Sequence, residues 1–575
     1  MDKKQVADIL EEIGALLELK GENPFKTRAY GNAARALRGL TEDLHELVTA
    51  NRLREIKGVG EAISLKISEL VTTGRLKYYD DLRSTFPAGF MELLRIPGFG
   101  PKKARRLFDE LGIGSIAALE KFCQEDGLSQ LDGFGAKSQQ KILEGIQQLR
   151  RFSERHHYHK AFAAALPLFE AIKKHPKVLR AELAGSLRRH KETIKDIDIV
   201  ASCKDKDRPE IMDFFTRLPG VQSVVAKGDT KSSVLLANGI PADLRLLQDL
   251  QFPYLLHHFT GSAEHNIAMR GFAQKMGIKV SEHGLFKNDK LIPCKDEAAI
   301  FAALGMQFVP PELREDTGEI EAALAREIPE LIAKNDLCGV LHCHSTHSDG
   351  LNTIKEMAEA CQKLGFEYLG ISDHSMTVFY ANGLPPARVK AQHKEIDQLN
   401  ATMKNFRLFK GTECDILPNG KLDYPEEVLA SFDFVIASIH SSMNMNEEQA
   451  TKRLIKAMEH PAVRILGHPT GRLILGREGY PIHHRKVIDA AAALGVCIEI
   501  NASPYRFDLD WRHCKYARDR GVLISINPDA HEVEGIADIF YGAGIARKGW
   551  LRKQDVLNVK SAKEIAQWFG KKRTG

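Results

Sequence analysis

The stretch from Leu183 to Val200 reads LAGSLRRHKETIKDIDIV, and its second half alternates between charged and apolar residues. As a β-strand, this segment would place Asp196 and Asp198 on one face and Ile197 and Ile199 on the other. Two carboxylates side by side repel each other unless a cation lies between them. Because only oxygen ligands are available here, Mg²⁺ is the cation that fits best, and Mg²⁺ usually keeps a substrate phosphate among its ligands.

A turn of small residues precedes this strand. Gly185 and Ser186 allow a close approach to the backbone and offer a hydroxyl group, and Arg188 and Arg189 follow with two guanidinium groups. Such a turn suits a cluster of anionic oxygens. An Asp-x-Asp pair alone is more typical of an edge strand that faces water, but the turn upstream of it favours a site for metal and phosphate.

A third acidic residue occurs at Asp243, in the sequence IPADLRLL. Alternation places Asp243 and Arg245 on the face opposite Ala242 and Leu244. Carboxylates from neighbouring strands can together hold two metal ions for in-line phosphoryl transfer. We therefore expect Asp243 to join the two upstream aspartates in one acidic site.

These residues resemble the signature of the DNA polymerase X family, which includes DNA polymerase beta. The resemblance rests on Gly185-Ser186-Leu187-Arg188-Arg189, Asp196-x-Asp198, Asp243-x-Arg245 and Phe259-Thr260-Gly261-Ser262, in that order. It implies an α/β palm in which Asp196, Asp198 and Asp243 are catalytic and bind Mg²⁺ or Mn²⁺. A nucleotide-selecting subdomain would follow the palm. The residues that would contact the incoming nucleotide are Gly185, Ser186, Arg189, Arg245, Phe259, Gly261, Asn266 and Arg270.

The composition is that of a chain with several domains. The 575 residues exceed the usual size of one domain, and 43% hydrophobic residues are ample for buried cores. The formal net charge of +5 is small, so a surface that binds nucleic acid would be local. The nine cysteines contain no Cys-x-x-Cys pair, which argues for a reducing compartment and against a disulfide scaffold or a zinc finger. The sequence starts with charged residues and has no uninterrupted apolar run of about 18 residues, so we expect a cytoplasmic protein without a membrane segment. We also expect the protein to be a monomer.

Three glycine turns punctuate the helical N-terminal region. Each has two glycines around one apolar residue, and the glycines are Gly58 and Gly60, Gly98 and Gly100, and Gly133 and Gly135. The backbone N–H groups of such a turn can bind a phosphate at a helix N-terminus without reading base sequence. One such turn would indicate only the end of a helix, but three of them resemble helix-hairpin-helix motifs and favour DNA binding. The first hairpin also resembles the lyase domain of the polymerase X family, which implies Lys66 as a Schiff-base lysine. A solvated lysine on a helix is the alternative.

From Gly339 onward, short apolar segments each end in a polar or metal-binding residue. These ends recur at intervals of 27 to 39 residues, which is the length of one strand-helix unit. Parallel strands joined by helices close into a barrel whose strand carboxyl ends share one face, so the pattern predicts a (β/α)7-type barrel. The ligand-type residues expected on this face are His342, His344, Asp349, His374, Glu413, His440, His468, Asp529 and His531.

A mixed imidazole and carboxylate cluster of this size suits two or three ions such as Mn²⁺, Zn²⁺ or Fe²⁺, and not Ca²⁺. A single histidine at a strand end is usually just hydrogen-bonded, whereas several with acidic companions indicate a metal site. Strand alternation turns His342 and His344 inward together and Cys343 away. With Ser348-Asp349-Gly350, this half resembles the polymerase-and-histidinol-phosphatase (PHP) family, which implies a phosphoesterase that uses Mn²⁺ or Zn²⁺.

The expected organisation is an all-α N-terminal region, a polymerase beta-like core and a C-terminal barrel. The bounds are 1–85 for a lyase-like domain, 86–155 for a helical DNA-binding subdomain, 156–255 for the palm, 256–315 for the nucleotide-selecting subdomain, 316–337 for a linker and 338–575 for the PHP domain. Together the halves resemble the bacterial and archaeal type of DNA polymerase X. That resemblance implies a DNA repair enzyme that fills gapped or primed DNA from deoxynucleoside triphosphates, with a 3′-to-5′ exonuclease or 3′-end phosphatase. Two alternatives are a small-molecule phosphoesterase with a vestigial polymerase half, and a non-catalytic scaffold that binds DNA ends.

Overall fold

The computed structural model describes residues 1, 3–38, 44–56, 58–87, 89–94, 96 and 99–571. Contacts divide the chain into two compact units, Met1–Glu154 and Arg155–Gly575. Among the described residues, no helix combines the length and the apolar composition that a bilayer crossing requires.

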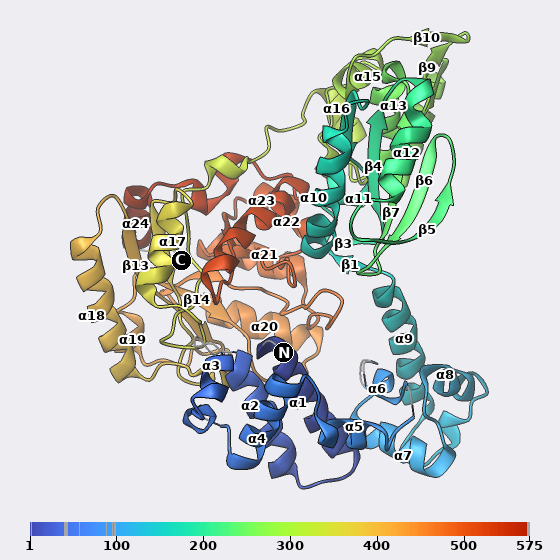
Figure 1. The fold of residues 1–575 in the computed structure, drawn as a ribbon. Helices are drawn as coiled ribbons and strands as arrows, with labels where there is room; N and C mark the ends of the chain where they lie inside the picture. The colour runs from blue at the N-terminus through green and yellow to red at the C-terminus, as the bar shows by residue number, and fades with distance from the viewer. Residues whose placement is uncertain are drawn as a thin grey trace. The chain divides into compact units, whose positions relative to one another are not determined.

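The N-terminal unit consists of helices joined by short turns (Figure 1). Apolar side chains on their inner faces, such as Leu10, Ile67 and Leu107, are buried in one core cluster. The helices are α1 (Lys3–Leu19), α2 (Pro24–Arg38), α3 (Leu44–Thr49), α4 (Glu61–Thr73), α5 (Lys77–Arg83), α6 (Phe90–Leu93), α7 (Pro101–Leu111), α8 (Ile116–Gln124) and α9 (Ala136–Ser153).

The second unit begins with a five-stranded sheet in the order β2-β4-β7-β6-β5. Its central strands β4 and β7 are parallel, and the other neighbouring pairs are antiparallel. Ile197 and Ile199 of β4 are fully buried while Asp198 is only partly covered, as the alternation predicts. The elements of this part are β1 (His156–His157), α10 (Tyr158–Lys174), β2 (Arg180–Leu183), α11 (Gly185–Arg188), β3 (Thr193–Ile194), β4 (Ile197–Ser202), α12 (Arg208–Thr216), β5 (Val221–Lys227), β6 (Lys231–Leu236) and β7 (Pro241–Leu247).

We call the five-stranded sheet, which lies in the region expected as the palm, the palm sheet. A helical segment with a small antiparallel sheet follows it in the chain. Its core contains Tyr254, Met269 and Phe301. The elements are α13 (Phe252–Thr260), α14 (Ala263–Lys275), β8 (Ile278–Ser281), β9 (Gly284–Lys287), β10 (Lys290–Ile292), α15 (Glu297–Ala303) and α16 (Glu319–Ala325). Helix α16 lies in the stretch expected as a linker, and its residue Glu319 is fully buried 2.7 Å from the ring of His265. The first part of this stretch is therefore packed against α14.

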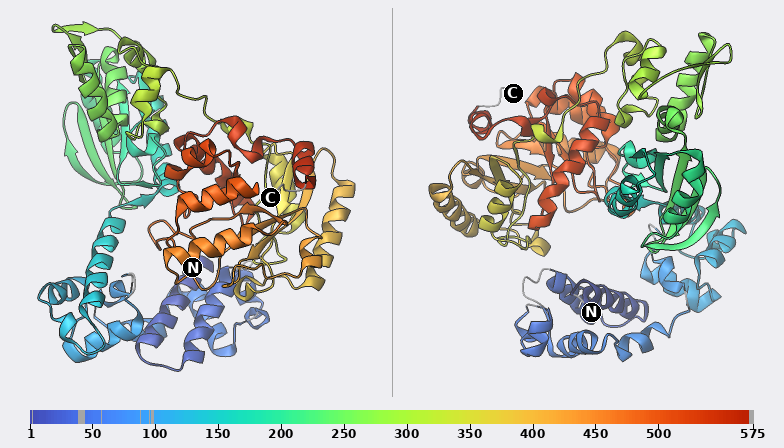
Figure 2. Two further views of the ribbon diagram at one scale, coloured as in Figure 1. Left: turned by 180° about the vertical axis from the view of Figure 1, so that it is seen from behind. Right: turned by 45° about the horizontal axis from the view of Figure 1, so that its top comes forward.

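The C-terminal part is a barrel of seven parallel strands in the sequential order β11 to β17, with helices outside it (Figure 2). A parallel bridge between Cys343 and Ala530 joins the two edges and nearly closes the barrel. Strands β12, β14 and β17 are buried along their whole length, as expected for a parallel sheet covered on both faces. The ring of Phe434 fills part of the barrel interior next to Gly411. A Cβ at Gly411 would lie 2.3 Å from this ring, so the ring fits only because residue 411 has no side chain.

The barrel confirms the predicted (β/α)7-type architecture of the C-terminal part. The all-α and α/β parts described above precede it in the chain. Its elements are β11 (Gly339–Val340), α17 (Ile354–Lys363), β12 (Tyr368–Ile371), α18 (Pro386–Thr402), β13 (Arg407–Asp415), α19 (Glu426–Leu429), β14 (Phe434–Ser438), α20 (Glu447–Met458), β15 (Val463–Leu466), α21 (His484–Leu494), β16 (Cys497–Asn501), α22 (Trp511–Asp519), β17 (Ile524–Asn527), α23 (Ile539–Lys548) and α24 (Ala562–Gly570).

Candidate active sites

The palm sheet brings the three predicted aspartates together. The parallel register of β4 and β7 pairs Asp198 directly with Asp243, and Asp196 comes just before β4 begins. Burial and the charges of Asp196 and Asp243 raise the pKa of Asp198 to about 7. The site therefore disfavours its own negative charge, as expected where a divalent cation would balance it.

The turn at Gly185 lies directly against these carboxylates. Gly185 begins α11 with a φ of +61°, and a Cβ added there would lie 2.3 Å from Asp198 Oδ2. The backbone N–H of Ala184 donates to the carbonyl oxygen of Asp198 over 2.8 Å. Glycine is thus required here both by the backbone conformation and by the closeness of the carboxylate.

Cationic side chains from two strands face Asp243. Lys231 Nζ lies 2.7 Å from Asp243 Oδ2, and the guanidinium of Arg245 lies 3.7 Å from the same oxygen. Arg245 also stacks on the ring of Phe259, with 3.7 Å between its central carbon and the ring centroid. Sequence reasoning missed Lys231, because its place beside Asp243 depends on the pairing of β6 with β7.

The predicted nucleotide contacts gather around the end of α13. Asn266 donates to the carbonyl oxygen of His258 over 2.8 Å, and Arg270 donates to the carbonyl oxygen of Asn266 over 3.1 Å. Gly261 ends α13 with a φ of +68°, and a Cβ there would lie 3.0 Å from a guanidinium nitrogen of Arg189. These residues therefore connect α13 and α14 to the turn that carries Ser186.

Arg189 is tied to the barrel through Glu315. Its Nε donates to Glu315 Oε1 over 3.0 Å, and another guanidinium nitrogen donates to the carbonyl oxygen of Thr260. The buried ammonium of Lys548, at the end of α23, donates to the same carboxylate over 2.6 Å and to the carbonyl oxygen of Arg189 over 3.0 Å. Although burial opposes the charge of Glu315, these cations lower its pKa to about 2.

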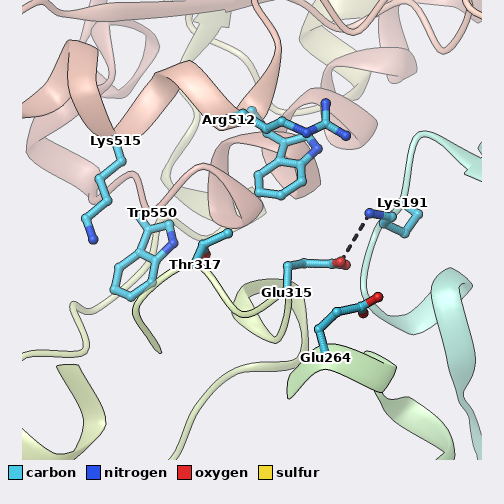
Figure 3. A pocket seen from close by; sticks show the side chains of 8 residues that line it. Lys191, Glu264, Glu315, Thr317, Arg512, Lys515 and Trp550 are labelled. Atoms are coloured by element: carbon cyan, nitrogen blue, oxygen red, sulfur yellow. Dashed lines mark hydrogen bonds and ion pairs between the residues drawn. The ribbon is translucent and has the colours of Figure 1, made fainter. Parts of the chain in front are cut away.

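The same carboxylate faces a cavity of about 480 Å³ at this junction (Figure 3). Lys191 lies 3.1 Å from Glu315, and Trp550 and Lys515 stand on the opposite side of the view. The Lys515 ammonium lies 4.2 Å from the centre of the Trp550 ring. The junction between the polymerase part and the barrel is thus polar and held by paired charges.

In the N-terminal unit, the glycine turns stand at the starts of helices. Gly60 caps α4, Gly100 caps α7, and Gly135 precedes α9. Gly58 and Gly133 have positive φ angles of 96° and 77°, and Gly98 lies outside the described residues. This arrangement leaves backbone N–H groups at helix N-termini.

Lys66 lies on α4, where its ammonium donates to the carbonyl oxygen of Ala62 over 3.1 Å. The same ammonium lies 4.7 Å from the centre of the Tyr78 ring. The lyase role of Lys66 stays a prediction, since these contacts are those of an ordinary helix lysine as well.

The mouth of the barrel gathers all nine ligand-type residues. Glu413, near the end of β13, stands at the centre of this cluster. Its Oε2 lies 3.0 Å from His374 Nδ1, and its Oε1 lies 3.1 Å from His440 Nε2 and 2.8 Å from His468 Nε2. Other short separations include those of His342 with Glu413 (3.4 Å), His344 with Asp529 (3.0 Å), His374 with Asp349 (3.6 Å) and His531 with Asp349 (3.5 Å).

The geometry of this cluster fits metal ions. Three subsets have ligand atoms that all lie within 4.8 Å of one another, and these are His344, Asp349, His374 and His531; His342, His344 and Asp529; and His374, Glu413 and His440. His342 Nε2 and His344 Nδ1 are buried and have no hydrogen-bond partner among the described residues. Buried imidazole nitrogens without partners are expected where a cation would bind them.

The pKa values of the histidines in this cluster are shifted in opposite directions. Burial and the imidazoles of His531 and His374 lower the pKa of His344 to about 4, so this ring keeps a free lone pair at neutral pH. Although burial opposes charge, Glu413 and Asp415 raise the pKa of His440 to about 10. A cation bound to His440 would have to displace this proton, because metal-ligating imidazoles are neutral.

Supporting residues around these ligands were missed from the sequence. Glu499 on β16 is fully buried, with Oε1 2.7 Å from His342 Nδ1, and Oε2 accepts from the N–H of His468 over 2.9 Å. Asn501 donates to Asp529 over 2.9 Å. Glu499 and Asn501 lie at the end of a strand, as the predicted ligands do. This position in the sequence could have indicated that they lie at the barrel mouth. Cys343 is buried in the core beside the barrel, and it takes no part in the cluster.

The fold and the two sites are those of an enzyme that acts on phosphoryl groups, with an acidic palm site and a barrel whose mouth gathers metal-type ligands. Family models match four regions of the chain. These are a helix-hairpin-helix domain at 1–76, a SAM-like helix-hairpin-helix tandem at 90–148, a DNA polymerase beta thumb at 255–315 and a PHP domain at 341–503. The "DNA polymerase/3′-5′ exonuclease PolX" of Bacillus subtilis is 40% identical over 570 residues, which cover 98% of this chain and 99% of that protein. The chain therefore belongs to the bacterial type of the DNA polymerase X family, in which a polymerase beta-like core is joined to a PHP domain.

The barrel alone also has shorter relatives. A probable phosphatase of Thermoanaerobacter sp. is 29% identical over 243 residues, which are 40% of this chain and 94% of that protein. A probable phosphatase of Caldanaerobacter subterraneus is 31% identical over 201 residues, which are 33% of this chain and 74% of that protein. The barrel is thus similar to proteins that lack the polymerase part.

Proposed function

We propose that this chain adds nucleotides to a primer 3′ end at the palm site and removes nucleotides from a 3′ end at the barrel mouth. The observation that carries the proposal is that Asp198 and Asp243 are paired in register beside Gly185 in the same chain that gathers eight clustered metal-type ligands, with His468 beside them, on one barrel face. The identity with PolX over nearly the whole chain supports the pairing of the two activities. The substrates would be gapped or primed DNA and deoxynucleoside triphosphates.

At the palm, Asp196, Asp198 and Asp243 would hold Mg²⁺ or Mn²⁺. When bound, these ions would supply positive charge to the triphosphate and to the primer 3′ oxygen. Ser186 would donate its hydroxyl to a phosphate oxygen, and Arg189 would exchange Glu315 for the triphosphate. The ring of Phe259, held by Arg245, would limit the space beside the sugar.

At the barrel mouth, the nine-residue cluster would hold two or three Mn²⁺ or Zn²⁺ ions. When bound, these ions would favour ionisation of water and stabilise charge on the phosphate. Glu413 bridges the histidines of neighbouring strands and fixes their spacing. Glu499 orients His342 through its other ring nitrogen, which keeps His342 Nε2 free for a ligand.

The direct test is a gapped duplex labelled at the primer 5′ end and incubated with Mn²⁺, with and without nucleotides. We expect longer products with nucleotides and shorter products without them. Asp198→Asn is expected to abolish extension and to retain trimming, because the two acidic sites share no residue. His344→Ala is expected to do the reverse. Loss of both activities in each variant would contradict two independent sites, and no extension by the unchanged chain would contradict the polymerase.

Similarity to probable phosphatases favours a second candidate activity for the barrel, the removal of a 3′-terminal phosphate. A primer that ends in a 3′ phosphate distinguishes this activity from exonuclease action. Release of inorganic phosphate without shortening of the primer would identify a phosphatase. Release of mononucleotides from a 3′-hydroxyl end would identify an exonuclease.

A further inference from the structure

Two large aromatic side chains stand exposed beside the barrel mouth. Phe379 and Tyr380, in a short turn between β12 and α18, expose 85% and 63% of their surface. Aromatic rings are usually among the more buried side chains, because their burial from water is worth several kcal/mol. Two adjacent rings left in water therefore call for an explanation by function.

The turn that carries them is fixed to the metal cluster at several points. Ser375 donates its N–H to the carbonyl oxygen of Glu413 over 3.0 Å, and Leu384 donates to the carbonyl oxygen of His374 over 2.9 Å. The Asn382 side chain donates to the carbonyl oxygen of Ser348, next to Asp349, over 3.1 Å. Both ends of the turn thus rest on segments that hold ligands, and the two rings are held at the rim.

Charge at the same rim suits a nucleic-acid backbone. The Nε of Arg506 lies 3.6 Å from Asp529 Oδ2, and Arg477 donates over 2.9 Å to the carbonyl oxygen of Gly471, whose own N–H donates over 2.9 Å to the carbonyl oxygen of His468. Partial burial and the charges of Glu413, Asp415 and Asp349 raise the pKa of Tyr380 to about 12, which agrees with its place near the cluster. Tyr380 and two guanidinium groups therefore lie near the nine ligand-type residues, and Phe379 is next to Tyr380 in the chain.

We infer that Phe379 and Tyr380 form a platform on which the unpaired bases of a DNA 3′ end stack while Arg477 and Arg506 bind its phosphates. Proteins that bind single strands without reading sequence combine stacking rings with cationic groups in this way. A small phosphate ester has no bases to stack, so the platform would select a strand end over a small ester. This inference rests on the proposed exonuclease function and names what it recognises.

The test compares a single-stranded oligonucleotide, labelled at its 5′ end, with the small diester bis(4-nitrophenyl) phosphate, both with Mn²⁺. For Phe379→Ala/Tyr380→Ala, we expect the KM for the oligonucleotide to rise at least roughly 25-fold, since each stacked base contributes about 1–3 kcal/mol, a factor of about 5 to 140, and the variant lacks both rings. Turnover of the diester should change less than about twofold. Tyr380→Phe should behave as the unchanged protein, because stacking needs the ring and not the hydroxyl.

Leu364→Ala is the matched control, since Leu364 is an exposed apolar residue of the barrel outside this turn. An unchanged KM for the oligonucleotide in the double variant would overturn the platform, as would an equal fall in diester turnover. A changed sedimentation coefficient without a change in KM would show that the rings instead contact a second copy of the chain, and would overturn it too. If the unchanged protein turns over the diester but not the oligonucleotide, the proposed exonuclease fails instead.

Discussion

At the residue scale, Gly185 is the position where the palm tolerates no side chain. Gly185→Ala would add a Cβ that lies 2.3 Å from Asp198 Oδ2, so the carboxylate must move. Misplacement of a reacting group by about 1 Å costs on the order of 100-fold in rate. We expect nucleotide addition to fall by about that factor and trimming at the barrel to stay unchanged, measured on the gapped duplex.

Gly239→Ala separates backbone strain from this clash. Gly239 has a φ of +81°, similar in sign to the +61° of Gly185, and a Cβ there would meet nothing within 4 Å. Both variants should lose about 1–2 kcal/mol of stability from the left-handed conformation. Only Gly185→Ala should lose nucleotide addition. Equal loss in both variants would assign the effect to strain.

The raised pKa of Asp198 gives the metal-free protein a stability that falls as pH rises. Asp198 holds a proton up to about pH 7 in the folded state, whereas its ordinary value is 3.8. Between these values the folded state binds more protons than the unfolded state, so the free energy of unfolding decreases with increasing pH. In EDTA at pH 8 we therefore expect Asp198→Asn to have a higher Tm than the unchanged protein. Near pH 4 the difference should vanish, and a lower Tm at pH 8 would contradict the raised pKa.

At the element scale, the strand ends of the barrel form the site, and β16 contributes a supporting residue. Glu499→Gln would weaken the hold on His342 Nδ1 and remove an acceptor for the N–H of His468. Loss of such an outer partner typically lowers metal affinity 10-fold to 100-fold. We expect a fall of about that size in Mn²⁺ affinity, measured by titration, with nucleotide addition intact.

Glu395→Gln is the matched control for this prediction. Glu395 also contacts a histidine, with Oε2 2.8 Å from His347 Nε2, but His347 lies outside the ligand cluster. This variant should bind Mn²⁺ as the unchanged protein does. If both variants lose affinity equally, the loss would come from the net charge of the barrel and not from the orientation of His342.

The strand ends were predictable because each follows from a local pattern repeated along the chain. His342, Glu413 and Asp529 each end an apolar segment, so their meeting on one barrel face follows from the parallel topology. Glu499 also ends an apolar segment, so its place at the barrel mouth was predictable, but its contact with His342 was not, because that contact depends on how the barrel closes between β17 and β11. The burial of Glu319 likewise depends on its contact with His265, which is far away in the sequence. The charged residues around Glu319 therefore predict a linker when the sequence is considered alone.

At the scale of the whole second unit, Glu315 joins the polymerase part to the barrel. Its carboxylate, with 8% of the side chain exposed, binds Arg189 on one side and the fully buried Lys548 on the other. The pKa of Glu315 is lowered from 4.5 to about 2, so its stabilising effect is present above about pH 4.5 and is lost as pH falls toward 2. At neutral pH the full effect therefore holds the two parts together.

Glu315→Gln would leave the ammonium of Lys548 buried without a counter-charge. Removing one partner of a buried pair costs about 3–5 kcal/mol. We expect this loss in urea unfolding at pH 7, with the polymerase part and the barrel unfolding in separate transitions. Asp397→Asn provides the contrast, because Asp397 pairs with Lys410 at the surface with 64% of its side chain exposed, and such pairs contribute about 0–1 kcal/mol.

Since Arg189 depends on Glu315 for its position, Glu315→Gln should also raise the KM for nucleotides. An unchanged KM together with the loss of stability would mean that Glu315 only joins the two parts and does not position Arg189.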